Sequence, residues 1–195
     1  MALSYYIIDT ETTGLKAGFH EVIQASIIRC EDQFQKTINI RAENPSRASK
    51  EALQVTKKTY ADLSQGIERK DAVEQMLAFM QEDGKTSDHR CVVAHNAAFD
   101  RRFLHAMFEA SNAKFPANLW LCTRSFSNKL AKRLGVVKPK LTLEASMERA
   151  GVKIRKGAHN ATVDTLNTYD LWSKLMNENL GHVSIIKRVP HGETV

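Results

Sequence analysis

Two acidic side chains separated by one threonine follow an apolar run near the start of the chain. The stretch IIDTETTGL begins at Ile7, and its two acids are Asp9 and Glu11. Because side chains alternate between the faces of a strand, a strand over residues 5–9 would leave Asp9 and Glu11 pointing the same way where it ends. Neighbouring carboxylates repel each other, and a cation that prefers oxygen ligands, Mg²⁺ or Mn²⁺ rather than Zn²⁺, would relieve the repulsion. An ordinary polar turn is the alternative for this stretch.

A third carboxylate follows a second apolar strand. The segment RCVVAHN, residues 90–96, predicts a short strand, and AAFDRRFLHAMFEASN after it predicts an amphipathic helix with Asp100 in its first turn. A strand followed by a helix is typical of α/β proteins, so Asp100 can face the same sheet edge as Asp9 and Glu11. The alternative is an acid at a helix start, where the helix dipole favours it.

A histidine and a fourth carboxylate lie at the start of the last long helix, which the apolar spacing predicts from residue 161 to residue 176. His159 precedes this helix on flexible backbone beside Gly157, and Asp164 lies in the first turns next to the apolar stripe. That position keeps the Asp164 side chain near the body of the protein. Alone, His159 would be an ordinary surface histidine; its fixed offset from Asp164 favours a role in chemistry.

Together these segments resemble the motifs of the DEDDh family of 3′ to 5′ exonucleases, of the proofreading-subunit and ribonuclease T type. DTETTGL is similar to the first motif, HNAAFD to the second, and a histidine five residues before an aspartate to the third. The three occur in the family's order and span residues 9 to 164. The family divides according to whether a tyrosine or a histidine precedes the last aspartate, and His159 is characteristic of the histidine branch.

The resemblance implies a site of four carboxylates and one histidine. Asp9, Glu11, Asp100 and Asp164 would hold two divalent cations, Mg²⁺ with Mn²⁺ able to substitute, and His159 would act as general base. Two cations about 3.5 to 4 Å apart can activate a water on one side of a phosphodiester and stabilise the leaving oxygen on the other. A histidine with a pKa of about 6.5 can accept the proton of that water at neutral pH. The implied reaction releases nucleoside 5′-monophosphates from the 3′ ends of DNA.

The resemblance also implies residues that hold the end of the strand. Leu15 would wedge against the terminal base, for which loop packing is the alternative, backbone near Thr12 would grip the 3′ end, and Asn96 would shape the pocket. The segment EALQVT, which begins at Glu51, is similar to a family segment that lines the nucleotide pocket. It ends on Thr56 where many relatives have histidine, so nucleotide preference stays open.

Basic residues indicate where the rest of the strand could lie. Arg155 and Lys156 come shortly before His159, and we prefer them as phosphate contacts because of this closeness in sequence. Five further cations lie between the second and third motifs: Lys129, Lys132, Arg133, Lys138 and Lys140. For any one of these five, a solvated helix face is the alternative.

Three other functions remain open at this stage. An exoribonuclease that trims RNA 3′ ends would use the same five residues. A non-catalytic scaffold for a polymerase or another protein would retain the fold, and a basic nucleic-acid-binding protein would use the acids structurally. The expected partners are a nucleic acid with a free, single-stranded 3′ end and a protein such as a polymerase, with no membrane; the oligomeric state stays open.

The strands and helices that must position these residues can be predicted from the apolar patterns of the sequence, and together they indicate one α/β domain. Residues 21–30 and 33–40 read as two strands that join the first in an antiparallel meander, and residues 68–84 as an amphipathic helix. Helices are expected over 126–134 and 143–150, with Thr142 as N-cap and Gly151 as the stop of the second. We expect a ribonuclease H-like mixed sheet, with three antiparallel strands followed by parallel ones and helices on both faces. The expected exonuclease domain covers residues 1–178, and residues 179–195 are expected to form a mobile or partner-binding tail.

Composition agrees with a folded protein that binds a polyanion. Among 195 residues, 28 Lys and Arg stand against 22 Asp and Glu, a formal net charge of +6, and hydrophobic residues make up 43%. The excess of cations favours nucleic acid because neutralising phosphates releases counterions. Three scattered cysteines without C-x-x-C spacing fit a reducing compartment, and no signal peptide or long apolar stretch is visible, so a cytoplasmic location is expected.

Overall fold

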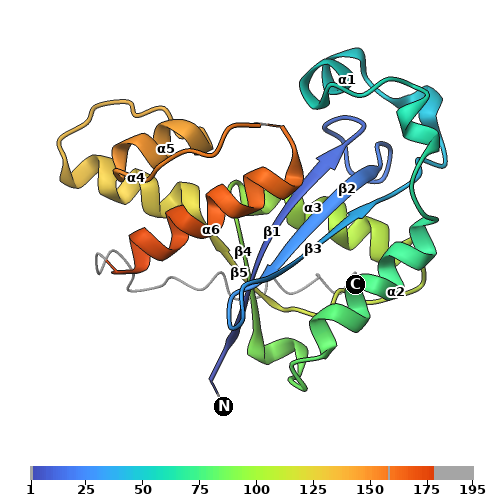
Figure 1. Cartoon of the computed structure of the whole chain (residues 1–195), viewed down its shortest axis with the longest axis horizontal. Helices are drawn as coiled ribbons and strands as arrows, with labels where there is room; N and C mark the ends of the chain where they lie inside the picture. The colour runs from blue at the N-terminus through green and yellow to red at the C-terminus, as the bar shows by residue number, and fades with distance from the viewer. Residues whose placement is uncertain (1, 158, 178–195) are drawn as a thin grey trace, which may run out of the picture.

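A five-stranded sheet forms the centre of the molecule, and helices cover both of its faces (Figure 1). The structure is a computed structural model that describes residues 2–157 and 159–177. The tail expected over residues 179–195 lies outside the described residues. The strands are β1 (Ser4–Thr12), β2 (Val22–Arg29), β3 (Phe34–Asn39), β4 (Arg90–Ala94) and β5 (Leu119–Cys122). The α-helices are α1 (Lys50–Thr56), α2 (Arg69–Gln81), α3 (Ala97–Glu109), α4 (Thr123–Arg133), α5 (Leu143–Arg149) and α6 (Ala161–Asn177).

The sheet has the mixed topology expected from the sequence. Its strand order is β3-β2-β1-β4-β5, in which β1 pairs antiparallel with β2, and β2 antiparallel with β3. Both β1 with β4 and β4 with β5 are parallel pairs. The ends of β1 and β4 therefore meet at one edge of the sheet, where the first two motifs lie.

Strand β1 is longer than the sequence predicts. The expected strand stops at Asp9, but pairing with β2 continues through Glu11, opposite Gln24, to Thr12, opposite Val22. The register shifts between Glu11 and Thr12, which is the mark of a β-bulge. The acidic residues consequently lie inside the paired part of the strand, where backbone hydrogen bonds hold them, rather than beyond its end.

Alternating residues of β1 pack into two separate hydrophobic cores, one on each face of the sheet. Tyr6 and Ile8 pack with α2 and α3 on one face, and Ile7 packs with α4, α5 and α6 on the other. All five residues of β4 are buried, as expected for a strand covered on both faces. This packing fixes the edge of β1 from both sides.

The helix ends mostly follow the sequence signals. The Thr142 hydroxyl accepts a hydrogen bond from the Ala145 amide at 3.3 Å, and Gly151 has a φ of 66°, so the predicted cap and stop of α5 are confirmed. Helix α4 begins at Thr123, three residues before its predicted start, because it follows β5 directly. Among the described residues, no helix is long and apolar enough to cross a membrane.

Candidate active site

Three of the predicted carboxylates converge beside the end of β1. One carboxylate oxygen from each of Asp9, Glu11 and Asp164 lies within 4.8 Å of the other two. The first two share a face of β1, and Asp164 comes from the first turns of α6. Two elements far apart in sequence therefore supply a single acidic cluster with only oxygen donors.

Asp100 approaches this cluster from α3. Only 3% of the residue is exposed, and its carboxylate accepts a hydrogen bond from the Thr10 hydroxyl at 2.9 Å. Thr10 lies between the two acids of β1, so its side chain points to the α3 side of the sheet. The charge of Asp100 acts on both Asp9 and Glu11. The structure thus brings all four predicted carboxylates into one electrostatic unit.

Burial and mutual repulsion raise the pKa values of these carboxyl groups. Burial, followed by the charges of Asp164 and Asp100, raises the pKa of Glu11 to about 7. Burial raises the pKa of Asp100 to about 7 although the Thr10 hydrogen bond opposes the shift. The pKa of Asp9 is raised well above its usual range, chiefly by burial and then by the other three acids.

A divalent cation fits this donor set. A positive charge favours the ionised form of each carboxyl group and so reverses the effect of burial and repulsion. Carboxylate oxygens without nitrogen or sulfur donors suit a hard cation of the Mg²⁺ or Mn²⁺ kind. The residues present therefore agree with a cation at this position.

His159 is tied to the cluster through its backbone. Its amide donates a hydrogen bond to Asp164 Oδ2 at 2.9 Å, and its φ of 62° is left-handed, which is uncommon for a residue with a side chain. The residue is exposed, so its ring is open to solvent. Asp164, whose pKa burial raises, thereby fixes the turn that carries the histidine.

Strands β2 and β3 hold the start of α6. Gln24 Oε1 accepts a hydrogen bond from the Ala161 amide at 3.0 Å, and its amide nitrogen donates to Asn39 Oδ1 at 2.8 Å. Gln35 donates to the Thr162 carbonyl at 2.8 Å. Gln24 lies opposite Glu11 in the hairpin.

The residues expected to grip the end of a strand surround the same edge. Leu15 is 81% exposed in the loop between β1 and β2. Glu51, on α1, and Asn96, before α3, are exposed, and Asn96 has a left-handed φ of 82°. Thr12 is buried, and its hydroxyl donates to the Gly14 carbonyl at 2.7 Å.

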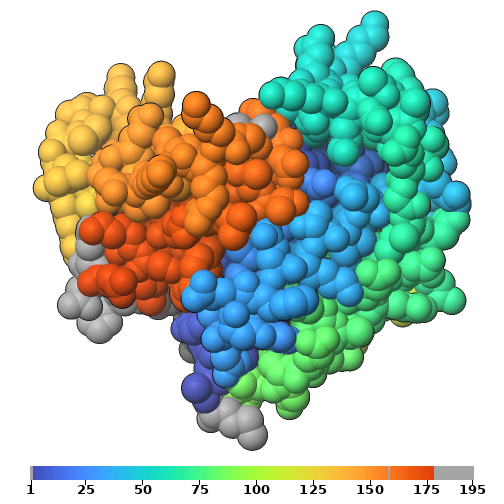
Figure 2. Space-filling view, in the orientation of Figure 1, coloured from blue at the N-terminus to red at the C-terminus, as the bar shows by residue number. Residues whose placement is uncertain are grey.

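Helix α1 is joined to this loop. The Ser49 amide donates to the Thr13 carbonyl at 2.8 Å. Figure 2 shows a hollow between the teal residues of α1 and the orange residues that lead into α6, with blue N-terminal residues between them. The exposed Leu15 and Glu51 therefore belong to segments that are held together beside the acidic cluster.

The two preferred phosphate contacts differ in their surroundings. The Arg155 guanidinium forms an ion pair with Asp170 of α6, and the Arg155 amide donates to Asn167 Oδ1 at 3.0 Å. Asp170 is six residues after Asp164, about 9 Å farther along the helix axis. Both residues are exposed, and Arg155 alone of the two is paired with α6 among the ion pairs of the described residues.

His95 links the second motif to the segment that follows α4. Its Nε2 lies 2.9 Å from the Leu141 carbonyl and its Nδ1 lies 2.8 Å from the Thr123 hydroxyl. Burial lowers the pKa of His95 to about 4, so the ring is neutral at pH 7. Nε2–H therefore donates to the carbonyl, and Nδ1 accepts from Thr123. Sequence reasoning missed this residue, although HNAAFD contains it.

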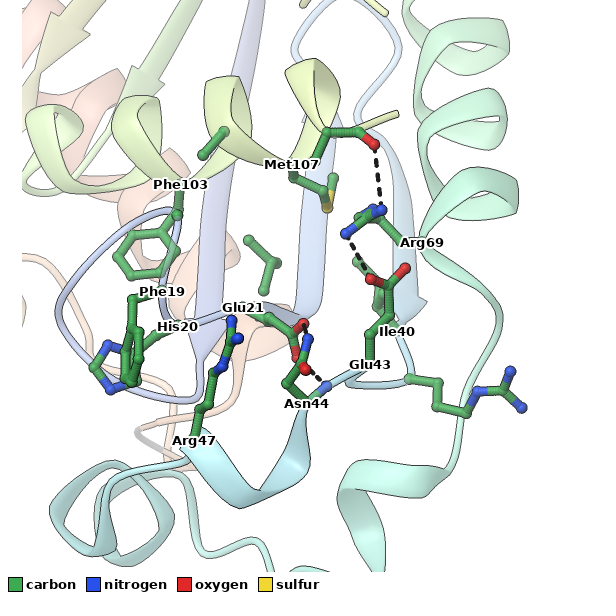
Figure 3. A pocket seen from close by; sticks show the side chains of 15 residues that line it. Phe19, His20, Glu21, Ile40, Glu43, Asn44, Arg47, Arg69, Phe103 and Met107 are labelled. Atoms are coloured by element: carbon green, nitrogen blue, oxygen red, sulfur yellow. Dashed lines mark hydrogen bonds and ion pairs between the residues drawn. The ribbon is translucent and has the colours of Figure 1, made fainter. Parts of the chain in front are cut away.

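A cavity of about 130 Å³ lies apart from the acidic cluster (Figure 3). Its lining includes none of the four carboxylates or His159. Polar groups around it bond one another: Asn44 donates to Glu21 at 3.1 Å, and Arg69 donates to Glu43 at 2.8 Å. This cavity is therefore separate from the candidate active site.

The fold and the acidic cluster together define a ribonuclease H-like protein with a site suited to divalent cations. The sequence profile of the exonuclease family matches residues 6–172, which is most of the chain. The chain belongs to this exonuclease family, in its DEDDh group, whose members are hydrolases that act on the phosphodiester bonds of nucleic acids.

Two relatives match the sequence over long stretches. A protein named DNA polymerase III PolC-type from Mycoplasmopsis pulmonis (strain UAB CTIP) is 30% identical over 146 residues, which are 71% of this chain and 10% of the relative. A protein named Ribonuclease T from Vibrio parahaemolyticus is 24% identical over 188 residues, which are 88% of this chain and 85% of the relative. The chain spans about a tenth of the length of the polymerase relative.

Solved structures share the fold. E. coli exonuclease I in complex with a dT13 oligonucleotide superposes with a TM-score of 0.73 at 16% identity, over 90% of this chain and 41% of that one. The nuclease domain of 3′hExo, a DEDDh family member bound to rAMP, superposes with a TM-score of 0.70 at 15% identity, over 91% of this chain and 93% of that one. At such identities the likeness concerns the fold.

Proposed function

We propose that this chain is a metal-dependent 3′ to 5′ exonuclease that hydrolyses the terminal phosphodiester of DNA and releases nucleoside 5′-monophosphates. The observation that carries the proposal is the convergence of Asp9, Glu11 and Asp164 within 4.8 Å, in a chain of the exonuclease family. Asp100, held by Thr10, and His159, held by Asp164, complete the set.

The four carboxylates would hold two divalent cations, Mg²⁺ with Mn²⁺ as a substitute. When bound, such cations polarise the phosphodiester and lower the pKa of a water molecule. The protein residues have separate tasks in this reaction. Thr10 orients Asp100, and the Gln24 bond to the Ala161 amide orients α6 and hence Asp164.

His159 accepts the proton of the attacking water. The bond from the water oxygen to phosphorus forms as the bond from phosphorus to the 3′ oxygen of the shortened strand breaks. That oxygen takes a proton from solvent water and leaves as a free 3′ hydroxyl, and the released nucleotide keeps its 5′ phosphate. An exposed imidazole next to the acidic cluster can take up this proton and return it to solvent.

The end of the strand would be held by residues around the hollow. Leu15 is exposed and would contact the terminal base, the Thr12 hydroxyl bonds the Gly14 carbonyl and shapes the loop backbone, and Glu51 and Asn96 are exposed and would contact the terminal nucleotide. A single-stranded 3′ end fits this arrangement because a terminal base must separate from its neighbours to reach an apolar wedge.

A second candidate substrate is RNA. The ribonuclease T relative covers 88% of this chain with 85% of its own length, which favours an exoribonuclease that trims RNA 3′ ends. The PolC-type relative supports the further proposal that the chain works beside a polymerase. Both substrates would use the same carboxylates.

A digestion panel tests the proposal and separates the two substrates. Matched single-stranded DNA, duplex DNA and RNA, each labelled, are incubated with Mg²⁺, with Mn²⁺ and with chelator. We expect Mg²⁺-dependent release of 5′-mononucleotides from the 3′ end of single-stranded DNA and no release with chelator. Faster digestion of RNA than of DNA would favour the exoribonuclease. No hydrolysis under any condition would overturn the proposal and favour a scaffold.

A further inference from the structure

The end of α4 and the start of its connection to α5 concentrate positive charge that is not in ion pairs among the described residues. Residues 129–140, the basic segment, contain no carboxylate and five cations: Lys129, Lys132, Arg133, Lys138 and Lys140. In the described part of the chain, none of the ion pairs involves any of these five. Arg29, Arg41 and Arg155, by contrast, are each paired with an acid.

The turn of the basic segment also exposes apolar side chains. Leu134 is 58% exposed and Val137 is 84% exposed, and every residue from 132 to 138 is exposed. The turn is nevertheless ordered by backbone bonds. The Val136 amide donates to the Ala131 carbonyl at 2.9 Å and the Gly135 amide donates to the Lys132 carbonyl at 3.1 Å, a Schellman end for α4. The apolar side chains thus project from a formed turn.

The far end of the basic segment is anchored beside the active site. His95 holds the Leu141 carbonyl at 2.9 Å, and His95 lies between the end of β4 and the start of α3, five residues before Asp100. In Figure 1 the α4–α5 connection and α1 lie on opposite sides of the end of β1. The C-terminal end of the basic segment is therefore joined to the strand–helix junction that carries Asp100.

We infer that the basic segment is a docking surface for the phosphate backbone of the substrate strand, upstream of its 3′ end. This inference rests on the proposed function. The acidic cluster repels a polyanion, and unpaired cations outside it offset that repulsion and release counterions on binding. The exposed valine and leucine side chains contact sugars and bases between the phosphates. Arg155, which the sequence favoured together with Lys156 as a phosphate contact, is paired with Asp170, whereas the ion pairs of the described residues include no cation of the basic segment.

An anionic membrane surface would also match cations around an apolar turn. Nucleic acid is favoured because the segment is anchored at the second motif, beside the carboxylates that a 3′ end must reach. Membrane binding is therefore an outcome of the test.

The test compares two triple variants of equal net charge. Lys132→Gln/Lys138→Gln/Lys140→Gln removes cations from the basic segment. Lys36→Gln/Lys70→Gln/Lys114→Gln removes three from β3, α2 and the connection from α3 to β5. The dissociation constant of a fluorescent single strand of about 20 nucleotides is measured in chelator over a range of salt, so the readout does not require hydrolysis. Hydrolysis of a dinucleotide and binding to vesicles with phosphatidylserine are measured in parallel.

We expect the basic-segment variant to bind the long strand at least about tenfold more weakly than the parent at low salt. The slope of the logarithm of the binding constant against the logarithm of the salt concentration should be smaller in magnitude by about two. Dinucleotide hydrolysis should stay at the parental rate, and the control variant should bind like the parent. Equal binding by both variants would overturn the inference, as would loss of vesicle binding without loss of strand binding. If the parent binds the strand through this segment but hydrolyses no substrate, the proposed function fails while the docking surface stands.

Discussion

At the scale of single residues, His159 is tied to the acidic cluster through its backbone amide, and the residue is exposed. The hydrogen bond from the His159 backbone amide to Asp164 and the left-handed φ of 62° place His159 at the cluster. This hydrogen bond does not involve the imidazole. An exposed imidazole at this position can accept a proton from an attacking water molecule and release it to bulk solvent.

The His159→Ala variant should therefore lose turnover rather than binding. We expect kcat to fall by about 10² to 10⁴, the usual contribution of a general base, while the dissociation constant for a single strand in chelator changes little. His89→Ala is a matched control, since that ring bonds Thr86 at the opposite end of β4. Unchanged kcat in His159→Ala would remove this residue as the base.

The residues of the site were predictable to different degrees. Asp9 and Glu11 could be grouped because strand alternation is a local rule, whereas Asp164 joined them only through the resemblance of its motif to the family. The role of His95 could not be predicted, because it depends on which backbone group the fold brings opposite the ring, the Leu141 carbonyl.

At the scale of elements, the sequence predicted the mixed sheet but not all of its bounds. Each predicted strand and helix reflects an apolar period, and these periods were sufficient for the strand–helix units. The extension of β1 to Thr12 depends on pairing with Val22 across a bulge, which no local pattern signals. The first turn of α4 lacks an apolar stripe, and it forms where buried Thr123 contacts His95.

The His95 bridge between β4 and the α4–α5 connection should make stability depend on pH. Burial lowers the pKa of His95 to about 4, below its value of about 6.5 in the unfolded chain. The unfolded state therefore binds the extra proton between these values, and stability present above about pH 6.5 is lost as pH falls toward 4.

Urea unfolding between pH 7.5 and pH 4.5 measures this effect. We expect the parent to lose more free energy of unfolding over this range than His95→Phe, by the order of 1 to 3 kcal/mol. His89→Phe should behave like the parent. If the free energy of unfolding changed with pH equally in the parent and in His95→Phe, burial of a neutral His95 would make no contribution to the pH dependence of stability.

At the scale of the whole molecule, a buried ion pair lies at the end of the sheet opposite the active site, where β4 begins. Arg90 and Asp83 are joined at 2.6 Å with side chains 3% and 1% exposed, and the Tyr6 hydroxyl lies 2.9 Å from Asp83 Oδ2. Burial alone would raise the pKa of Asp83, but the hydrogen bonds from Arg90 prevail and hold it at about 2.

Removing one partner should destabilise the fold without changing the chemistry. We expect Asp83→Ala to cost about 3 to 5 kcal/mol, because Arg90 is left buried and unpaired. The parent should lose the contribution of Asp83 as pH falls from about 4 to about 2, since a lowered carboxyl pKa stabilises only above that range.

Urea unfolding gives the cost, and kcat per folded molecule at low temperature gives the activity. Asp32→Ala, which breaks an ion pair with Arg29 in which Asp32 is 48% exposed, should cost much less. Equal losses for the two variants would contradict the assignment of the Arg90 pair as a buried structural unit.

We propose that the carboxylates beside β1 hold the divalent cations of a 3′ exonuclease. The most direct test is the rate of 5′-mononucleotide release from a labelled single strand with Mg²⁺, for the parent, Asp9→Asn and Asp164→Asn. We predict that each variant keeps its circular dichroism spectrum and loses more than about a hundredfold in rate, because each removes a charge on which cation binding depends. Release by either variant at the parental rate would contradict the account.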